Sequence, residues 1–469
     1  MSIPGKAKVG LLPFYLKLYD DLLPESRHLF DGFVARICAG LSDRGLEVVR
    51  GSICCMAVEF ETAVDAFALQ QVDAIITLHL AYSPSLESID AFCRSRLPLI
   101  LLDTTMDADF GLEVKAEKIM GNHGIHGVMD FACMLRRRER SFDIVAGYDG
   151  DPSLLDRAAL LVRAAVGASA FQGTKALRVA PAFAGMGDFS VASSLLRERF
   201  GITVDEVGMQ ELDQSVNAVA DAAVEAEIDL DLQRYDCDLE AETHRRSVRV
   251  GLGLRRLLEE GGYGAMSVNF LAFDGTARPA DTMPFLEISK AMSRGIGYAG
   301  EGDVLTASLV GALAQGFGKT TFTEMFCADW NGGALFLSHM GEISPAVAQS
   351  KARLFAKPFF VEGVPAPAVL NCAVKAGPAA LVNLAPGPGD SFSLIVAPVE
   401  VLAESAHMDP AMRDSIRAWV KPRLPVAAFL EWYARVGGTH HSALVLGDVT
   451  EAVCAFGRQI GVDVVTIAG

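Results

Sequence analysis

The feature that most constrains the fold of this chain is a change of pattern near residue 318. Before that point, short apolar runs such as VDAIITLHL alternate with amphipathic stretches, as in parallel sheets covered by helices. After it, segments such as SFSLIVAPVEVL are rich in β-forming residues and are separated by Gly and Pro turns. We predict an α/β protein with two open doubly wound α/β domains (residues 1–174 and 175–318) followed by a C-terminal β-barrel-like domain (residues 319–469).

The charge and the cysteines restrict the partners and the cellular compartment. A net charge of -17 repels phosphate backbones and anionic lipid, so we expect no nucleic acid and no membrane partner. The nine cysteines include no CxxC pair, which favours reduced thiols over a disulfide framework. Pro13 and Lys17 interrupt the N-terminal apolar run, which therefore does not fit a signal peptide. We expect a cytoplasmic protein.

Two glycine-rich segments match nucleotide-binding motifs only in part. GFGKTT at 316–321 follows a helical run rather than a strand, and Leu313 stands where the P-loop pattern requires Gly. GLGLRR at 251–256 lies inside a predicted helix and lacks the spacing of a dinucleotide-binding fingerprint. We interpret the first as the end of a helix and neither as a phosphate site.

Two glutamates and two histidines in the last third of the chain could hold a metal. They are Glu301 in YAGEGD, Glu324 in TFTEMF, His339 in FLSHMGE and His441 in GGTHHS. Such side chains bind divalent metals and leave positions open for a substrate. An unpaired Glu324 would be costly to bury in its apolar strand, whereas Glu301 also fits a carboxylate at a helix start. The spacings match no zinc-finger or HExxH pattern, so the residues alone leave both interpretations open.

Other histidines are interpreted from their local context. Three lie in polar surroundings and are predicted to be exposed: His28, His244 and His407. His79 ends an apolar strand, while His123 and His126 open a predicted helix in a Gly-rich turn. Each of these last three fits either a hydrogen-bonded structural histidine or a site residue.

The four segments that contain the candidate ligands also carry a family resemblance. GIGYAGEGD, TFTEMF, LSHMGEISP and GGTHHS, in this order and with these intervening lengths, resemble the metal-site motifs of L-arabinose isomerases, relatives of the L-fucose isomerases. Weaker similarity extends over nearly the whole chain and includes LHLAYSP at 78–84, NHGIHG at 122–127 and RRLLEEGGYGAMSVNF at 255–270. The four motifs are specific for the superfamily and not for a substrate.

The resemblance implies a three-domain subunit that acts on a small-molecule sugar and forms a homo-oligomer, usually a hexamer, or a trimer or dimer subassembly. It implies a divalent metal, typically Mn²⁺, held by Glu301, Glu324, His339 and His441. His126 matches a histidine that relatives contribute to the site of a neighbouring subunit. Further positions that match the substrate pocket of the family are His123, Tyr82, Met186, Phe270 and Met340.

The chemistry of such an enzyme explains why two carboxylates would lie beside one metal. Aldose–ketose interconversion moves a proton between adjacent carbons through an enediol, and a cation lowers the cost of the developing negative charge. One carboxylate carries the proton, while the other completes the ligand set or moves the hydroxyl proton. We assign Glu301 and Glu324 jointly to this acid–base pair.

The chain departs from the L-arabinose isomerase pattern around the sugar. LLPFYLKLYD stands where those enzymes carry a Gln-containing loop, His123 replaces a common Gln, and LAFDG after Phe270 replaces a Glu-Asp pair. We therefore expect a substrate other than L-arabinose. Two alternatives remain from the residues: a metal-dependent epimerase or other enediolate-forming enzyme, and a non-catalytic sugar-binding protein.

Overall fold

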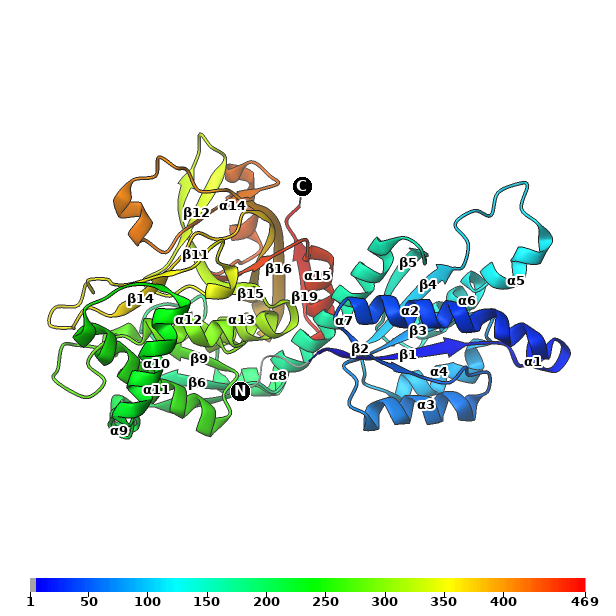
Figure 1. The fold of residues 1–469 in the computed structure, drawn as a ribbon, viewed down its shortest axis with the longest axis horizontal. Coiled ribbons are helices and arrows are strands. Elements are labelled where there is room, and N and C mark those ends of the chain that lie inside the picture. Colours follow the sequence, from blue (N-terminus) through cyan, green and yellow to red (C-terminus); the bar gives the residue numbers. More distant parts are fainter. Residues whose placement is uncertain (1–5, 469) are drawn as a thin grey trace. The chain divides into compact units, whose positions relative to one another are not determined.

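The computed structural model describes residues 6–468 (Figure 1). Within this range the chain divides into two compact units, with the division between Val166 and Gly167. We call them the N-terminal unit and the C-terminal unit and describe each by itself.

The N-terminal unit is built on a five-stranded parallel sheet with strand order β2-β1-β3-β4-β5. Its strands are β1 (Lys8–Phe14), β2 (Glu47–Arg50), β3 (Ala74–His79), β4 (Leu99–Thr105) and β5 (Asp143–Tyr148). The central strand β3 is buried at every residue and β1 at all but its first. Continuous apolar runs of this kind are expected where helices cover both faces of a parallel sheet.

Helices connect these parallel strands. They are α1 (Lys17–Leu22), α2 (Asp31–Asp43), α3 (Ala57–Leu69), α4 (Ser85–Arg94), α5 (Ile119–Asn122), α6 (Ile125–Arg137) and α7 (Pro152–Phe171), which crosses the division between the units. Each of α3, α4 and α6 places phenylalanines in one core cluster with Phe14 at the end of β1. This aromatic core lies beneath the carboxyl ends of β1 and β3, where ligands bind in open α/β sheets.

The C-terminal unit begins with a four-stranded parallel sheet of order β10-β9-β6-β7. Its strands are β6 (Lys175–Val179), β7 (Thr203–Val207), β9 (Ala265–Val268) and β10 (Gly297–Gly300). The associated helices are α8 (Ser193–Phe200), α9 (Met209–Asn217), α10 (Asp221–Arg234), α11 (Ala241–Gly261), α12 (Phe285–Ser293) and α13 (Val304–Phe317). A small second sheet, of order β14-β13-β8, joins β8 (Asp236–Asp238), β13 (Arg353–Ala356) and β14 (Ala368–Asn371).

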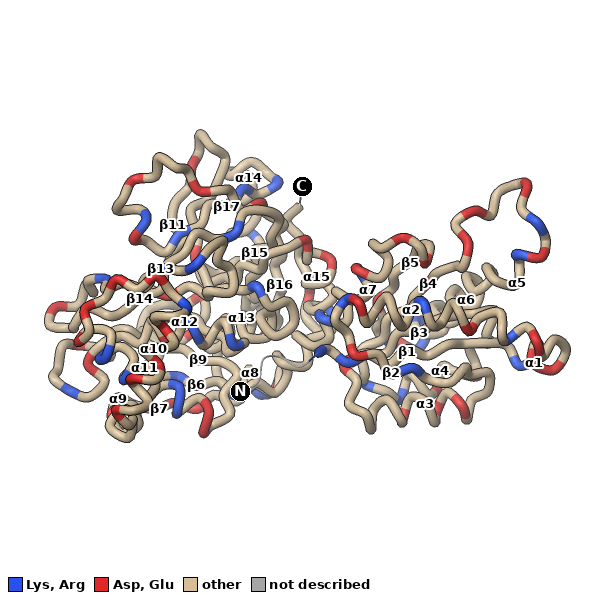
Figure 2. The backbone as a smooth tube through the Cα atoms, viewed as in Figure 1, with Lys and Arg blue, Asp and Glu red and all other residues tan. Residues whose placement is uncertain are grey.

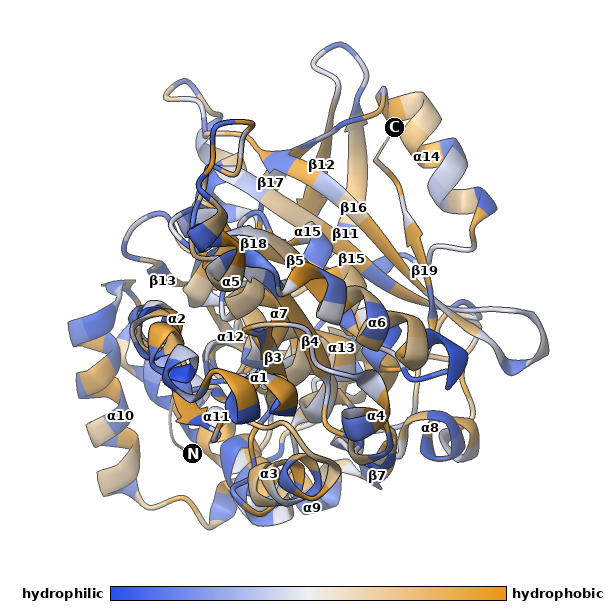
Figure 3. Cartoon of the chain, turned by 90° about the vertical axis from the view of Figure 1, so that its right-hand side faces the viewer, coloured by the Kyte–Doolittle hydropathy of each residue, from blue (hydrophilic) through white to orange (hydrophobic). Residues whose placement is uncertain are grey.

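The rest of the C-terminal unit is a closed antiparallel barrel of six strands, in the order β15-β18-β11-β12-β17-β16, which the pairing of β15 with β16 closes. The strands are β11 (Thr320–Asp329), β12 (Ala334–Ser338), β15 (Gly377–Pro386), β16 (Phe392–Val401), β17 (Ala418–Pro422) and β18 (His441–Leu446). Strand β19 (Asp463–Thr466) pairs in parallel with β16, and α14 (Val426–Arg435) and α15 (Thr450–Gln459) complete the unit (Figure 3).

Helix α13 links the parallel sheet to the barrel. It is apolar nearly all round and buried along almost its whole length, as expected for a helix covered on every side. It contacts β9 and β10 of the sheet and β11, β15 and β18 of the barrel. Gly297 in β10 permits the close approach, because a Cβ there would lie 1.8 Å from the carbonyl oxygen of Ala307. The loop from β10 into α13 is thereby held against the barrel.

This architecture confirms the predicted fold class of parallel α/β sheets followed by a C-terminal β-barrel. Helix α13 ends at Phe317, and Gly318 follows with φ of 81°, so GFGKTT marks a helix end as predicted. Acidic and basic residues are interspersed along the backbone of both units (Figure 2). Among the described residues, no helix is both long enough and apolar enough to cross a membrane.

Candidate metal centre

Glu301, Glu324, His339 and His441 come together in the C-terminal unit. One ligand atom from each lies within 4.8 Å of the corresponding atoms of the other three. The barrel aligns three of them: Glu324 in β11 is opposite His441, the first residue of β18, and also opposite Ser338, which precedes His339 at the end of β12. His441 begins the strand that follows the turn formed by its preceding glycines. Glu301 follows directly after β10 and completes the group from the parallel sheet.

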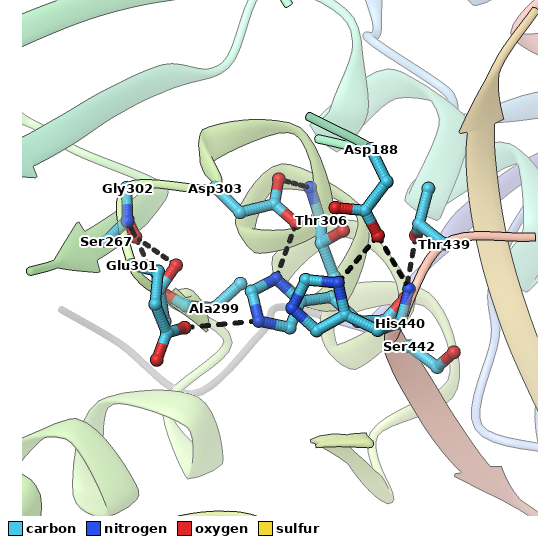
Figure 4. Close-up of polar contacts among 12 residues, drawn as sticks. Asp188, Ser267, Ala299, Glu301, Gly302, Asp303, Thr306, Thr439, His440 and Ser442 are labelled. Atoms are coloured by element: carbon cyan, nitrogen blue, oxygen red, sulfur yellow. Dashed lines mark hydrogen bonds and ion pairs between the residues drawn. The ribbon is translucent and has the colours of Figure 1, made fainter. Parts of the chain in front are cut away.

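The backbone around Glu301 is unusual and firmly held. Glu301 has a backbone φ of 58°, in the left-handed region that residues other than Gly rarely adopt. Residues held in this region concentrate at functional sites. The carbonyl oxygen of Glu301 accepts a hydrogen bond from the backbone N–H of Phe183 at 2.8 Å. Ser267 Oγ accepts from the N–H of Gly302 at 2.8 Å and donates to the carbonyl of Ala299 at 2.7 Å (Figure 4). These bonds keep the strained turn and aim the Glu301 carboxylate.

A carboxylate orients each of the two histidines. Asp303 Oδ2 lies 2.9 Å from Nδ1 of His441, and Glu342 contacts Nδ1 of His339. The second oxygen of Asp303 accepts from the N–H of Thr306 at 2.9 Å and so caps the N-terminus of α13. With each Nδ1 engaged, each Nε2 is directed at the two glutamates. A carboxylate on the far nitrogen is the usual support for a histidine that binds a metal.

The centre of the group favours positive charge. Nε2 of His441 lies 3.1 Å from Glu301 Oε2 and 3.0 Å from Glu324 Oε1, and Nε2 of His339 lies 3.3 Å from Glu324 Oε1. Burial opposes protonation of His339, but Glu342 and Glu324 outweigh it and raise the pKa of His339 to about 10. The pKa of His441 rises against burial in the same way, through Asp303 and the two glutamates, to about 11. Burial disfavours the charge on Glu324, yet the histidines lower its pKa to about 2.

The donor set fits a divalent metal. Glu301 Oε2 and His441 Nε2 are buried and lie 3.1 Å apart, but neither makes a well-aligned hydrogen bond with any group of the described residues, and such an arrangement is costly to bury. A cation between them would satisfy both lone pairs. Two carboxylates and two imidazoles suit several divalent transition metals, Mn²⁺ among them.

A loop formed by residues 181–192 contacts the centre. Asp188 accepts from the backbone N–H of His440 at 2.9 Å and contacts its Nδ1 at 2.6 Å (Figure 4). The ring of Phe189 stacks on His441, with centroids 5.1 Å apart and planes 11° apart. Met186, from the predicted substrate pocket, lines a cavity of about 120 Å³ in the same loop.

Phe270 and Met340, two further predicted pocket residues, also lie in the C-terminal unit. Met340 follows the candidate ligand His339 directly and is half-buried. The ring of Phe270 lies 5.8 Å from that of Phe183, the residue whose N–H binds the Glu301 carbonyl. Met340 is therefore joined to a candidate ligand by a peptide bond, and Phe270 contacts a residue that is hydrogen-bonded to another candidate ligand.

Tyr82, His123 and His126 gather in the N-terminal unit. The Tyr82 ring stacks on His126 with centroids 5.1 Å apart, and its hydroxyl donates to Asp130 at 3.1 Å. His123 lies 5.4 Å from His126, ring to ring, and its Nε2 is 3.3 Å from the Tyr19 hydroxyl. His126 is exposed. These side chains form a group of their own within that unit.

Comparison with known proteins identifies the family. A profile of the L-arabinose isomerase central domain matches residues 190–316, and a profile of the L-arabinose isomerase C-terminal domain matches residues 319–463. The chain belongs to the L-arabinose isomerase family. The L-arabinose isomerases of Anoxybacillus flavithermus and Nocardioides sp. are each 28% identical to it, over 86% of this chain and 82% of theirs. That of Salmonella enteritidis is 28% identical over 80% of this chain and 78% of its own. This family member is an aldose–ketose isomerase.

In this L-arabinose isomerase family member, one histidine prediction was wrong. His28 and His407 are exposed as predicted, but His244 is buried, with Nε2 3.0 Å from Asp231 Oδ2. The same aspartate also pairs with Lys290. The residues next to His244 in sequence are polar, which predicted an exposed side chain. The structure shows that the side chain instead lies in a buried polar cluster with Asp231 and Lys290 of the neighbouring helices.

Four residues around the centre escaped the sequence argument: Asp188, Asp303, Glu342 and His440. Asp303 had a detectable signal, because an Asp just before a long apolar helical run is typical of an N-cap. Glu342 had a weaker one, its position three residues after a candidate ligand. Asp188 is 252 residues from His440, and no spacing rule would connect them.

Proposed function

We propose that this protein is a divalent-metal-dependent aldose–ketose isomerase whose substrate is a sugar other than L-arabinose. The observation that carries the proposal is the set of four ligand atoms within 4.8 Å of one another, each histidine backed by a carboxylate. A non-catalytic sugar-binding protein would have no use for such a centre.

Glu301, Glu324, His339 and His441 would hold the metal, for which we propose Mn²⁺. When bound, such a cation stabilises the negative charge that develops on two neighbouring substrate oxygens during enediol formation. With a metal bound in place of the Nε2 proton, Asp303 and Glu342 would accept from the Nδ1–H of each imidazole and leave Nε2 as the ligand atom. The ligand geometry is thereby fixed before a substrate arrives.

Glu301 and Glu324 would carry the protons. Both carboxylates face the same centre. One can take the proton from C2 of an aldose and return it to C1, while the other transfers the proton between the two hydroxyl oxygens. Glu301 is almost fully buried, whereas 14% of the Glu324 side chain is exposed. Glu324 is therefore the carboxylate that a substrate entering from solvent reaches more easily.

The residues around the predicted sugar site support a changed substrate. Where relatives carry a Gln-containing loop, Phe14 and Tyr15 are fully buried in the N-terminal unit. His123, which replaces a Gln, contacts the hydroxyl of Tyr19 in α1, the helix that follows Phe14 and Tyr15. Rings replace amide groups here, and a pocket that loses hydrogen-bonding groups no longer favours the same hydroxyl pattern.

The test is conversion by the purified, manganese-loaded protein of a panel of aldoses and ketoses that includes L-arabinose, followed by NMR in deuterated water. We expect carbonyl migration with deuterium at one carbon, and a higher kcat/KM for another sugar than for L-arabinose. Glu324→Gln should lower kcat by about 100-fold or more. Glu431→Gln, an exposed change on α14, is the matched control and should not.

Three results would contradict the proposal. Turnover that survives both Glu324→Gln and exhaustive chelation would exclude the mechanism. L-arabinose as the best substrate would exclude the proposed specificity. Inversion at a carbon without carbonyl migration would identify an epimerase.

We further propose that the enzyme is a homo-oligomer in which His126 serves the site of a neighbouring copy, as the resemblance implies. Glu324→Gln and His126→Ala would then damage different parts of a shared site. Mixing the two inactive variants under conditions that exchange subunits should restore part of the activity, because some sites then receive both intact residues. A monomer by analytical ultracentrifugation, or no restoration on mixing, would exclude this arrangement.

A further inference from the structure

A cavity of about 330 Å³ opens in the C-terminal unit, and Met340, the residue after the candidate ligand His339, lines part of it. Its walls are mainly apolar and include the rings of Phe285, Phe359 and Phe360. Lys357 is the one charged residue among the described residues that line it. Aromatic walls with a single polar group are typical of a pocket that binds a small molecule in one orientation.

The ammonium of Lys357 has no carboxylate partner. Its hydrogen bond goes to the carbonyl oxygen of Met340 at 2.7 Å, and no carboxylate of residues 6–468 lies within ion-pair distance. Burial among apolar side chains lowers the pKa of Lys357. The two acidic residues whose charges act on Lys357 are engaged elsewhere: Glu342 binds His339, and Asp414 binds Arg353. A cation held this way is stabilised by an anion that enters the cavity.

Residues next to the candidate ligand His339 line or pack against the cavity. Met340, whose carbonyl binds Lys357, is the residue after His339. Phe285 packs directly on Gly341, where a Cβ would lie 2.6 Å from the ring. On another side, the ring of Phe360 lies 5.3 Å from that of Phe270, which contacts Phe183 beside Glu301. The cavity therefore shares Met340 with the segment that carries a candidate ligand, and Phe270 connects its far wall to the residues beside Glu301.

We propose that this cavity binds the carboxylate end of an acidic sugar, so that the preferred substrates are uronates. This inference rests on the proposed isomerase function. The aldehyde end lies at the centre, the C–H faces of the carbon chain contact the phenylalanine rings, and Lys357 pairs with the terminal carboxylate. The carboxylate takes no part in the proton transfer. One cation without an arginine suits a single negative charge better than a phosphate, which usually draws several donors.

The test uses the manganese-loaded full-length protein with D- and L-hexuronates, each beside its neutral parent aldose and the 6-phosphate of that aldose. We expect at least one uronate to have a higher kcat/KM than its parent and its 6-phosphate. Lys357→Met should reduce this preference by on the order of tenfold or more, mainly through KM. Lys357→Arg should retain most of it, because it keeps the charge. Lys375→Met, at an exposed lysine in the same unit, is the matched control and should leave the preference unchanged.

The outcomes separate this inference from the proposed function. If neutral sugars are converted as well as uronates, or if Lys357→Met leaves the preference intact, the inference is wrong and the isomerase proposal stands. A preference for 6-phosphates would also overturn it. If no sugar is converted, the proposed function fails, and calorimetry with D-galacturonate decides the inference alone. Binding that Lys357→Met weakens at least tenfold supports the pocket, and equal or absent binding overturns it.

Discussion

Two buried histidines, His79 in the N-terminal unit and His441 in the C-terminal unit, experience opposite electrostatic effects. Their exposed fractions are 3% and 0%. His441 lies among Asp303, Glu301 and Glu324, which outweigh burial and raise its pKa to about 11. His79 packs against Phe14, 4.4 Å away ring to ring, and burial lowers its pKa to about 3. The partners, and not the depth of burial, decide whether a buried imidazole attracts a cation or excludes one.

The contrast extends to the surroundings of each histidine. Around His441 the nitrogens face carboxylates on both sides of the ring. Within residues 6–468 neither nitrogen of His79 has a hydrogen-bond partner, and its neighbours include Phe131 of the aromatic core. The first arrangement is suited to a metal and the second to a neutral ring. Two substitutions test this contrast directly, and a third tests a contact of Asp130, a charge that acts on His79.

The largest effect is expected from Asp303→Asn. The substitution keeps an oxygen that can accept from Thr306 N–H and cap α13, but removes the negative charge from Nδ1 of His441. Manganese affinity should fall by about 10- to 100-fold, the usual consequence of losing such a partner. Calorimetric titration with Mn²⁺ measures this, and circular dichroism checks that the fold is intact. An unchanged affinity would show that the carboxylate behind His441 is not needed for binding.

A smaller effect, dependent on pH, is expected from His79→Leu. In the folded chain the pKa of His79 is about 3, below its ordinary 6.5, so the unfolded chain takes up a proton that the folded chain refuses. The folded chain is therefore not penalised by His79 above pH 6.5, and its free energy of unfolding decreases as the pH falls from 6.5 toward 3. Leucine does not titrate, so the variant should gain about 2 kcal/mol relative to the wild type between pH 8 and pH 5. Urea denaturation at the two pH values measures the difference. A constant difference would mean that His79 becomes protonated without hindrance.

The smallest effect is expected from Tyr82→Phe. It removes the hydrogen bond from the Tyr82 hydroxyl to Asp130 but keeps the ring stacked on His126. The free energy of unfolding should fall by about 0.5–1.5 kcal/mol. Tyr148→Phe, at a partly exposed tyrosine of the same unit, is the control and should cost less. Equal losses in the two variants would show that the Asp130 contact contributes nothing specific.

The sequence predicted the fold class and brought the candidate ligands to attention for different reasons. Parallel sheets and barrels leave local patterns, so the change near residue 318 was visible without any structure. The candidate ligands were visible because Glu324 interrupts an apolar strand and because the four surrounding segments resemble a family. Neither argument needed long-range contacts.

What escaped prediction depends on contacts between distant segments. His244 looked exposed because its neighbours in sequence are polar, yet Asp231 and Lys290 from other helices enclose that polarity. Lys357 showed no signal, because a lysine without a carboxylate is recognised only when every element around it is known. Pairing partners far apart in sequence follow no local period, and this limits what a single sequence can reveal.

The profiles of the central and C-terminal domains meet between residues 316 and 319, at the end of α13, but the candidate ligands lie on both sides of that junction. Glu301 belongs to the first segment, and Glu324, His339 and His441 belong to the second. Asp303, at the start of α13, reaches across to the second segment. A chimera joining the central segment of one family member to the barrel of another would therefore divide the centre itself. Moving the whole centre into another family member therefore requires exchanging both segments together.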